Sequence, residues 1–162
     1  MSFLVRKINK AKWYQIDIMQ SDEVSADAIT NCLKTTKNTL SVWHIETEED
    51  LEKAVLAIVA NQDHLDTIDV VILDEPSLTN YHLNIVASPG ETPVASLIQA
   101  HRDIAELSFS KLGYVKEHIV QRIRSHKLKR YTVSSLKKIL TSAINEGLLK
   151  KEDLTESIRQ KI

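Results

Sequence analysis

Short stretches rich in apolar, branched and aromatic residues occur along the first half of the chain and predict strands. They cover residues 3–7, 38–45 and 68–73, and a further alternation of apolar and polar positions covers residues 81–86. The segment 68–73 is apolar almost throughout, so we expect this strand to lie in the middle of a sheet.

Apolar residues that recur every three or four positions predict helices between and after these strands. Ser25 is placed to cap a helix that ends near Leu33, and Thr47 is placed to cap one that ends near Gln62. After residue 90 only helical spacing is found, and Gly147 stands where one of these helices should end. The four expected helices begin near Pro93, Ser110, Thr132 and Leu154.

These elements predict an α+β fold, with a small mixed sheet and packed helices in the N-terminal half, followed by an all-helical C-terminal part. The length of 162 residues fits one domain of about 150 residues. We therefore interpret residues 1–162 as a single domain. The loop 88–93 holds two of the three prolines, so a division into an α/β part (1–90) and a helical part (91–162) is the alternative.

Composition excludes several classes of protein. The single cysteine, Cys32, cannot form an internal disulfide, which excludes a disulfide-stapled secreted scaffold. The longest apolar run, Ala54–Ala60, is far shorter than the roughly 20 residues that a membrane-spanning helix needs. The first residues place apolar side chains before basic ones, the reverse of a secretory signal. We expect a folded, soluble, cytoplasmic protein that does not enter the membrane.

The apolar segment 68–73 continues into Asp74, Glu75 and Pro76. This pattern resembles the Walker B strand of ABC-type ATPases, in which the aspartate helps to hold magnesium and the glutamate orients a water. A phosphate-binding loop needs Gly-Lys followed by Ser or Thr, whereas the three glycines here precede Glu, Tyr and Leu, and no two are closer than 23 positions. We therefore interpret Asp74 and Glu75 as the polar end of a strand.

Charge is divided unevenly along the chain, although the formal net charge is only −1. Residues 1–12 hold four basic residues and no acidic one, and residues 13–110 hold 4 basic and 17 acidic residues. Residues 111–150 hold 10 basic and 2 acidic residues, and the remainder is balanced. Such asymmetry is typical of chains that bind nucleic acid or a charged partner.

A helix over residues 110–126 would place several basic and aromatic side chains on one face, because positions three or four apart are neighbours. Basic residues continue to position 138. Cations interleaved with an aromatic side chain are typical of phosphate contact combined with base stacking. The candidate residues for binding nucleic acid or a partner are Lys111, Tyr114, His118, Arg122, Lys129, Arg130, Lys137 and Lys138.

The leading hypothesis is a non-enzymatic macromolecular interaction module, of the accessory, adaptor or immunity type, that binds a charged protein partner or a second copy of itself. The alternative is a nucleic-acid-binding protein that uses the basic helical face at 111–138. Two further alternatives stay open: the basic face is merely solvated, or the acidic region 13–110 neutralises it within one molecule.

Catalytic and metal chemistry have little support in the sequence. His118 and His126 would stand about 12 Å apart on a helix, too far for one metal ion, and no phosphate loop or nucleophile motif occurs, so we expect no metal and no cofactor. The catalytic alternative places Asp74, Glu75 and His82 together, if the strands at 68–73 and 81–86 form a hairpin.

The two tryptophans differ in their expected roles. Trp43 lies in an alternating segment and is expected to fill the core or an interface. Trp13 and Tyr14 follow the basic N-terminal residues and are expected to form an exposed anchor.

Overall fold

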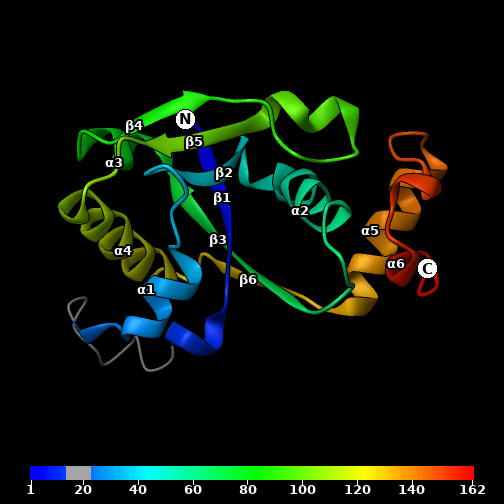
Figure 1. Cartoon of the computed structure of the whole chain (residues 1–162), viewed down its shortest axis with the longest axis horizontal. Helices are drawn as coiled ribbons and strands as arrows, with labels where there is room; N and C mark the ends of the chain where they lie inside the picture. Colours follow the sequence, from blue (N-terminus) through cyan, green and yellow to red (C-terminus); the bar gives the residue numbers. More distant parts are fainter. Residues whose placement is uncertain (14–22) are drawn as a thin grey trace.

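The computed structural model describes residues 1–13 and 23–162. Its centre is one six-stranded sheet in which every pair of neighbouring strands is antiparallel, in the order β4-β5-β2-β1-β3-β6 (Figure 1). The strands are β1 (Phe3–Ile8), β2 (Leu40–Ile45), β3 (Ile68–Asp74), β4 (Asn84–Ala87), β5 (His101–Ala105) and β6 (Leu128–Tyr131). The helices are α1 (Ala26–Cys32), α2 (Leu51–Ala60), α3 (Glu75–Asn80), α4 (Phe109–Arg124), α5 (Val133–Asn145) and α6 (Glu156–Arg159).

The register aligns one row of side chains across four strands. Val5 of β1 is paired with Trp43 of β2 on one side and with Ile72 of β3 on the other. Trp43 is in turn paired with His101 of β5. Because paired residues point to the same face of a sheet, these four side chains all project towards the side that α2 covers.

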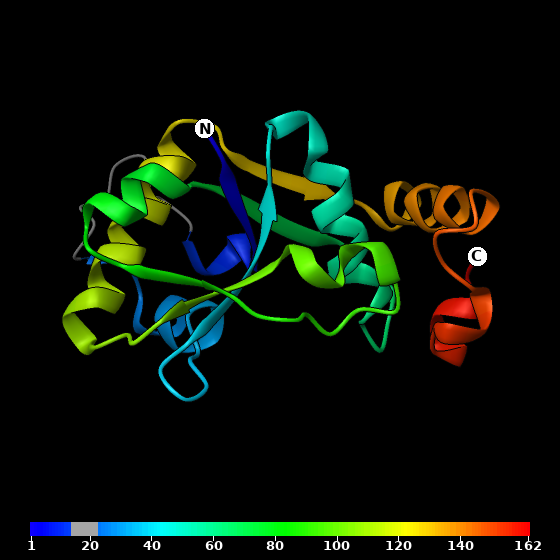
Figure 2. The same ribbon diagram turned by 90° about the horizontal axis from the view of Figure 1, so that it is seen from above.

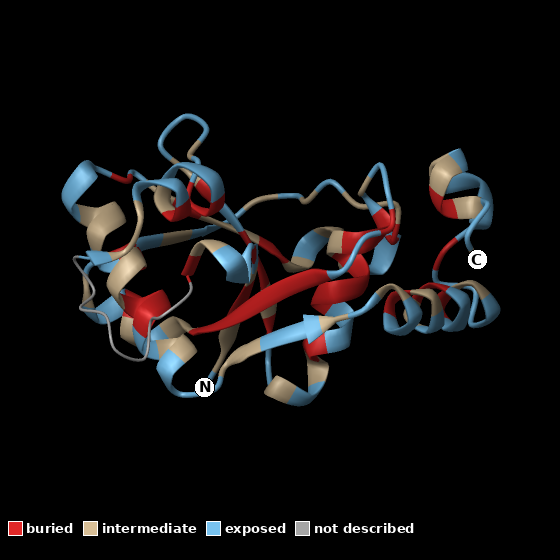
Figure 3. Ribbon diagram, turned by 90° about the horizontal axis from the view of Figure 1, so that it is seen from below, coloured by how far each residue is buried: buried red, intermediate tan, exposed pale blue. Residues whose placement is uncertain are grey.

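Helices cover both faces of the sheet, which therefore separates two hydrophobic cores. Val5, Val70 and Ile72 pack in the core formed with α2 and α5. Leu4 and Val71 pack in the core formed with α1, α3 and α4. The alternation along β1 and β3 thus fills both cores at once, and β3 is buried along nearly its whole length (Figure 3). The apolar segment 68–73 is thus a buried strand with a neighbour on each side, as expected, but it lies next to the edge strand β6 and not in the middle of the sheet.

Several local predictions are confirmed by the caps of the helices. The side chain of Ser25 accepts a hydrogen bond from Ala28 N–H at the start of α1, and that of Thr132 accepts one from Ser135 N–H at the start of α5. Gly147 follows the end of α5 with φ +76°, in the left-handed region that glycine adopts most readily.

The predicted mixture of helices and strands is confirmed, but its arrangement differs in two ways. The sheet is antiparallel instead of mixed, and β5 and β6 belong to the part expected to be all-helical. Strands from both sides of residue 90 thus pair with each other: β5 lies between β4 and β2, and β6 pairs with β3.

Two predicted elements are shorter than expected. The helix expected from Pro93 is a 3-10 helix, Ala95–Ala100, and the last helix is confined to α6. The strand expected at 81–86 is displaced to β4, because α3 takes up residues 75–80.

Asp74 caps α3 by accepting a hydrogen bond from Ser77 N–H, and Pro76 occupies its first turn, where proline is well tolerated.

None of the helices that the structure describes is both long enough and apolar enough to cross a membrane.

Candidate binding surfaces

His118, one of the predicted binding residues, is buried between α4 and β3. Its Nε2 accepts a hydrogen bond of 3.0 Å from the backbone N–H of Asp74, so the ring proton lies on Nδ1. Nδ1 is itself buried and makes no hydrogen bond within the described part of the chain. Burial, assisted by the nearby positive charge of Arg122, lowers the pKa of His118 to about 4. His118 is therefore a neutral interior group.

Arg122 and Lys127 converge on one acidic side chain. The Nε of Arg122 donates to the carbonyl oxygen of Ile72 at 2.6 Å. This carbonyl lies just beyond the last residue of β3 that is paired with β6. Its Nη2 lies 3.9 Å from Oε1 of Glu48, and Nζ of Lys127 lies 2.8 Å from the same oxygen. Glu48, from the acidic segment, thus neutralises two cations of the basic segment.

Arg130 is engaged in the same way. Its guanidinium donates to both carboxylate oxygens of Asp69, at 2.8 and 3.2 Å, across the β3–β6 pair. Burial alone would raise the pKa of Asp69, but the hydrogen bonds from Arg130 and from the backbone N–H of Lys10 outweigh it, so the pKa is lowered. These contacts agree in part with the alternative that the acidic region 13–110 neutralises the basic residues within one molecule.

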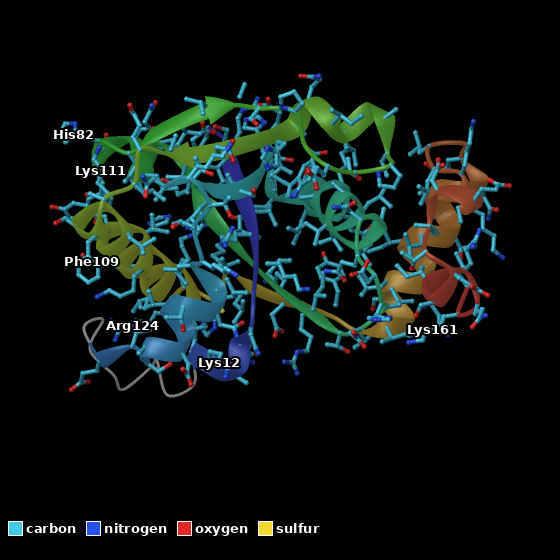
Figure 4. All side chains as sticks on the ribbon, viewed as in Figure 1. Lys12, His82, Phe109, Lys111, Arg124 and Lys161 are labelled. Carbon is cyan, nitrogen blue, oxygen red and sulfur yellow. The ribbon has the colours of Figure 1, made fainter. Side chains whose placement is uncertain are left out.

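Six lysines of the basic segment make no ion pair with any described residue. They do not gather on one face, because Lys111 projects near one end of the molecule (Figure 4), whereas α5, which carries Lys137 and Lys138, lies at the other (Figures 1 and 2). The six are Lys111, Lys116, Lys129, Lys137, Lys138 and Lys150.

Exposed aromatic side chains mark the end of the molecule formed by α3 and the start of α4. The rings of Tyr81 and Tyr114 stack with their centroids 5.1 Å apart. Phe109, the first residue of α4, is 94% exposed, and it projects at the same end as His82 and Lys111 (Figure 4). We call this surface the α3–α4 end; it comprises Tyr81, His82, Phe109, Lys111 and Tyr114.

Among the eight residues predicted to bind, the structure brings only Lys111 and Tyr114 to the α3–α4 end. Phe109 escaped sequence reasoning because the helix was expected to begin near Ser110, one position after it. An aromatic residue directly after a helix cap, here Ser108, is the signal that could have revealed it.

The catalytic alternative is not assembled. Asp74 serves as the cap of α3, and Glu75 accepts a 2.6 Å hydrogen bond from the hydroxyl of Ser2. Nε2 of His44 lies 3.7 Å from the same Glu75 carboxylate. His82 is exposed beyond the end of α3, and no hydrogen bond or ion pair among the described residues joins it to either carboxylate.

The structure agrees with the expected role of one tryptophan and not with that of the other. Trp43 is buried in the core, as predicted. Trp13 is also buried, so the prediction of an exposed anchor is wrong for Trp13, and Tyr14 lies outside the described residues.

A cleft of about 530 Å³ opens on the α2 face of the sheet. Its floor includes Trp43 and His101, whose rings meet edge to face at a centroid distance of 5.1 Å. One wall is the C-terminal end of α2 with Asn61 and Gln62, and the other is the loop 88–91. We call this the His101 cleft. The sequence does not reveal this cleft, because only helical spacing is found after residue 90, whereas His101 lies at the start of β5.

A second cleft, of about 680 Å³, lies where β1 ends, but its main polar groups are already paired. The guanidinium of Arg6 donates to the carbonyl oxygens of Cys32 and Ser41, and burial lowers its pKa to about 10. Asp69 and Arg130 pair with each other there. Within residues 1–13 and 23–162, no cluster of three or more His, Cys, Asp or Glu side chains is arranged to hold a metal ion.

Comparison with known protein families, with curated proteins and with solved structures finds no match to this chain.

Proposed function

We propose that the protein is a non-enzymatic interaction module that docks a protein partner at the α3–α4 end. The observation that carries the proposal is the 94% exposure of Phe109. An aromatic ring left in water forgoes the stabilisation of roughly 1.5–3 kcal/mol that its burial provides. Exposed aromatic side chains beside cations are the residues that most often dominate protein–protein binding energy.

Charge indicates the kind of partner. Lys111 and Lys116 lie in the first two turns of α4 and have no ion pair among the described residues. Opposite charges on two surfaces speed their encounter and fix their register. The partner surface is therefore expected to combine an apolar pocket for Phe109 with acidic residues around it.

A protein partner fits this surface better than nucleic acid. Arg122, Lys127 and Arg130, which would have extended a cationic track along the basic segment, are held by the chain's own carboxylates. Non-specific nucleic-acid binding draws its affinity from many phosphate contacts, and the α3–α4 end offers few free cations.

Photo-crosslinking in the native cell tests the proposal. Phe109 is replaced by p-benzoylphenylalanine, and the matched control carries the same residue in place of Leu148, which is 43% exposed beyond α5. We expect a discrete protein adduct from position 109 alone, resistant to nuclease. The additional substitution Lys111→Glu should reduce its yield about tenfold, because it removes an attraction and adds a repulsion.

Three outcomes would contradict the proposal. Equal adducts from both positions would mean that the crosslinks are non-specific, and no adduct from position 109 would mean that Phe109 contacts nothing. An adduct that nuclease removes would favour the alternative, a nucleic-acid-binding protein. Since Phe109 makes few contacts within the fold, loss of folding does not complicate the test.

A further inference from the structure

The His101 cleft is lined by polar side chains that the fold leaves without partners. His101 and Trp43 are each only 8% exposed, and Nε2 of His101 and Nε1 of Trp43 make no hydrogen bond with any described residue but remain open to solvent. The same holds for the side chains of Ser41, Asn61 and Gln62. Water satisfies these groups in the free protein, and a ligand that carries hydroxyl or N–H groups can take the place of that water.

The tautomer of His101 is set by its second nitrogen. Nδ1 lies 3.0 Å from the carbonyl oxygen of Ser88, which can only accept, so Nδ1 carries the proton. Nε2 therefore holds a lone pair. His101 lines this cleft, so the exposed part of its ring opens onto it. The cleft thus offers an oriented acceptor to a hydroxyl or N–H group.

The loop that walls the cleft is held in place. The N–H of Gly90 donates to the carbonyl oxygen of Ile98 at 2.9 Å. Glycine is needed there, because a Cβ at position 90 would lie 2.7 Å from Cβ of His101 and would overlap the end of the Trp43 ring. A site fixed in advance loses little entropy when a ligand binds.

The charges around the cleft select a neutral ligand. Glu91 and the negative end of the α2 helix dipole disfavour an anion. Arg6 also lines the cleft, but its guanidinium is held by the carbonyl oxygens of Cys32 and Ser41. Lys7 disfavours a cation and has no ion pair among the described residues. A hydroxyl group can donate to Nε2 of His101 and accept from an amide, indole or ammonium N–H. We propose that the His101 cleft binds a small, neutral, polyhydroxylated molecule such as a sugar ring.

The span of the site matches a ligand of this size. Lys7 lies two strands and two residues away from His101 in the sheet, which places their Cα atoms about 12 Å apart. Side chains from both ends extend into the intervening space, so one ring with several hydroxyls can contact both ends. The site lies on the α2 face, away from the α3–α4 end, and does not depend on the proposed function.

Nuclear magnetic resonance of the full chain, with ¹⁵N labels in the histidine and tryptophan rings, tests the proposal. The neutral probes are D-glucose and adenosine, which present hydroxyls on a free sugar and on a nucleoside ribose. The charged controls are inorganic phosphate and methylammonium. We expect a saturable shift of the His101 Nε2 and Trp43 Nε1 signals with at least one neutral probe, at a Kd below about 10 mM, and none with either ion.

Two variants locate the binding. His101→Phe keeps an aromatic ring against Trp43 and removes the acceptor, and Asn61→Trp fills the cleft from an exposed position without touching the core. Each should raise the Kd about tenfold or more, the first read from the Trp43 signal. The matched control His64→Phe alters an exposed histidine outside the cleft and should leave the Kd unchanged.

The proposal is overturned if neither neutral probe shifts the two signals, if phosphate or methylammonium binds more tightly, or if Asn61→Trp binds as the unmodified chain does. If only adenosine binds, the ligand class narrows to nucleosides, and if only glucose binds, it narrows to free sugars. A variant that loses its folded spectrum is set aside, because the other variant still decides the question.

Discussion

At position 118 a histidine is kept neutral inside the fold, and this has a consequence for stability at acid pH. In the unfolded chain a histidine titrates near pH 6.5, whereas in the folded protein the pKa of His118 is about 4. Between these values only the unfolded chain binds this proton. Lowering the pH therefore favours unfolding, by up to about 1.4 kcal/mol per pH unit.

The variant His118→Gln should show a shallower fall in stability between pH 6.5 and pH 4, because glutamine does not titrate and its carbonyl can still accept from Asp74 N–H. Urea unfolding at several pH values measures the slope. The control His126→Asn changes an exposed position with left-handed backbone, which asparagine tolerates, and should keep the original slope. Identical slopes in all three proteins would contradict the assignment.

Two glycines should respond in opposite ways to alanine. Gly90→Ala should lower the free energy of unfolding by about 1–3 kcal/mol, because the added methyl overlaps Trp43 and His101. Gly113→Ala should raise it by about 0.5–1 kcal/mol, because the site lies within α4 and nothing stands within 4 Å of the added methyl. Thermal or urea unfolding measures both, and a stabilised Gly90→Ala variant would refute the close packing of the loop.

The residues that the sequence revealed are those whose role is local. Ser25, Thr132 and Gly147 act within three or four positions, so spacing alone identifies them. The partners of Arg122 and Arg130 lie 50 or more positions away, so only the folded sheet could show that these cations are neutralised. For the same reason, the spacing that predicted a basic helical face gave no sign that His118 is buried.

At the scale of elements, Glu48 ties the start of α2 to the connection between α4 and β6. Removing its charge leaves Lys127 and the half-buried Arg122 without their acidic partner. In a double-mutant cycle, Glu48→Gln and Lys127→Met should show a coupling of about 0.5–1 kcal/mol, since both groups are about one-third exposed. Urea unfolding of the four proteins gives this value, which should shrink at high salt. Additive effects would mean that the pair contributes nothing.

Helices and strands could be predicted where the apolar residues of the segment itself form a face that packs on the core. They could not be predicted where the segment is stabilised mainly by the elements next to it. The apolar strands β1, β2 and β3 were expected nearly as they are. β5 and β6 were not predicted, because they carry several charged residues. Strands at or near the edge of a sheet show only a weak alternation of apolar and polar residues, and pairing with the neighbouring strand stabilises them. α3 escaped because its few residues match the ordinary polar end of a strand.

At the scale of the whole molecule, strand order predicts how the protein unfolds. A fragment of residues 1–90 would lack β5, and with it the link between β4 and β2, and would leave β3 without β6. We expect this fragment to be unfolded, and the full chain to lose helix signal and tryptophan fluorescence at one midpoint. A folded fragment, or two separate midpoints, would instead support a division near residue 90.

The candidate site was predictable only in part, because it depends on this same long-range arrangement. Lys111 and Tyr114 were found from the basic segment, whereas Phe109 and the His101 cleft depend on which surfaces the helices and the loop 88–91 leave open. His101 reaches its position only because β5 inserts beside β2, 56 or more positions after that strand ends.

The position of β1 inside the sheet governs how the chain can fold as it leaves the ribosome. β1 is synthesised first of the six strands, yet its two flanking strands are completed only at residues 45 and 74, and β3 itself waits for residue 131 to gain its outer neighbour. The apolar strands β2, β1 and β3 therefore cannot all pair until residue 74 has been made, and the outer edges of β2 and β3 stay open until residues 105 and 131 are made. Nascent chains of this protein should depend on holding chaperones for much of their synthesis.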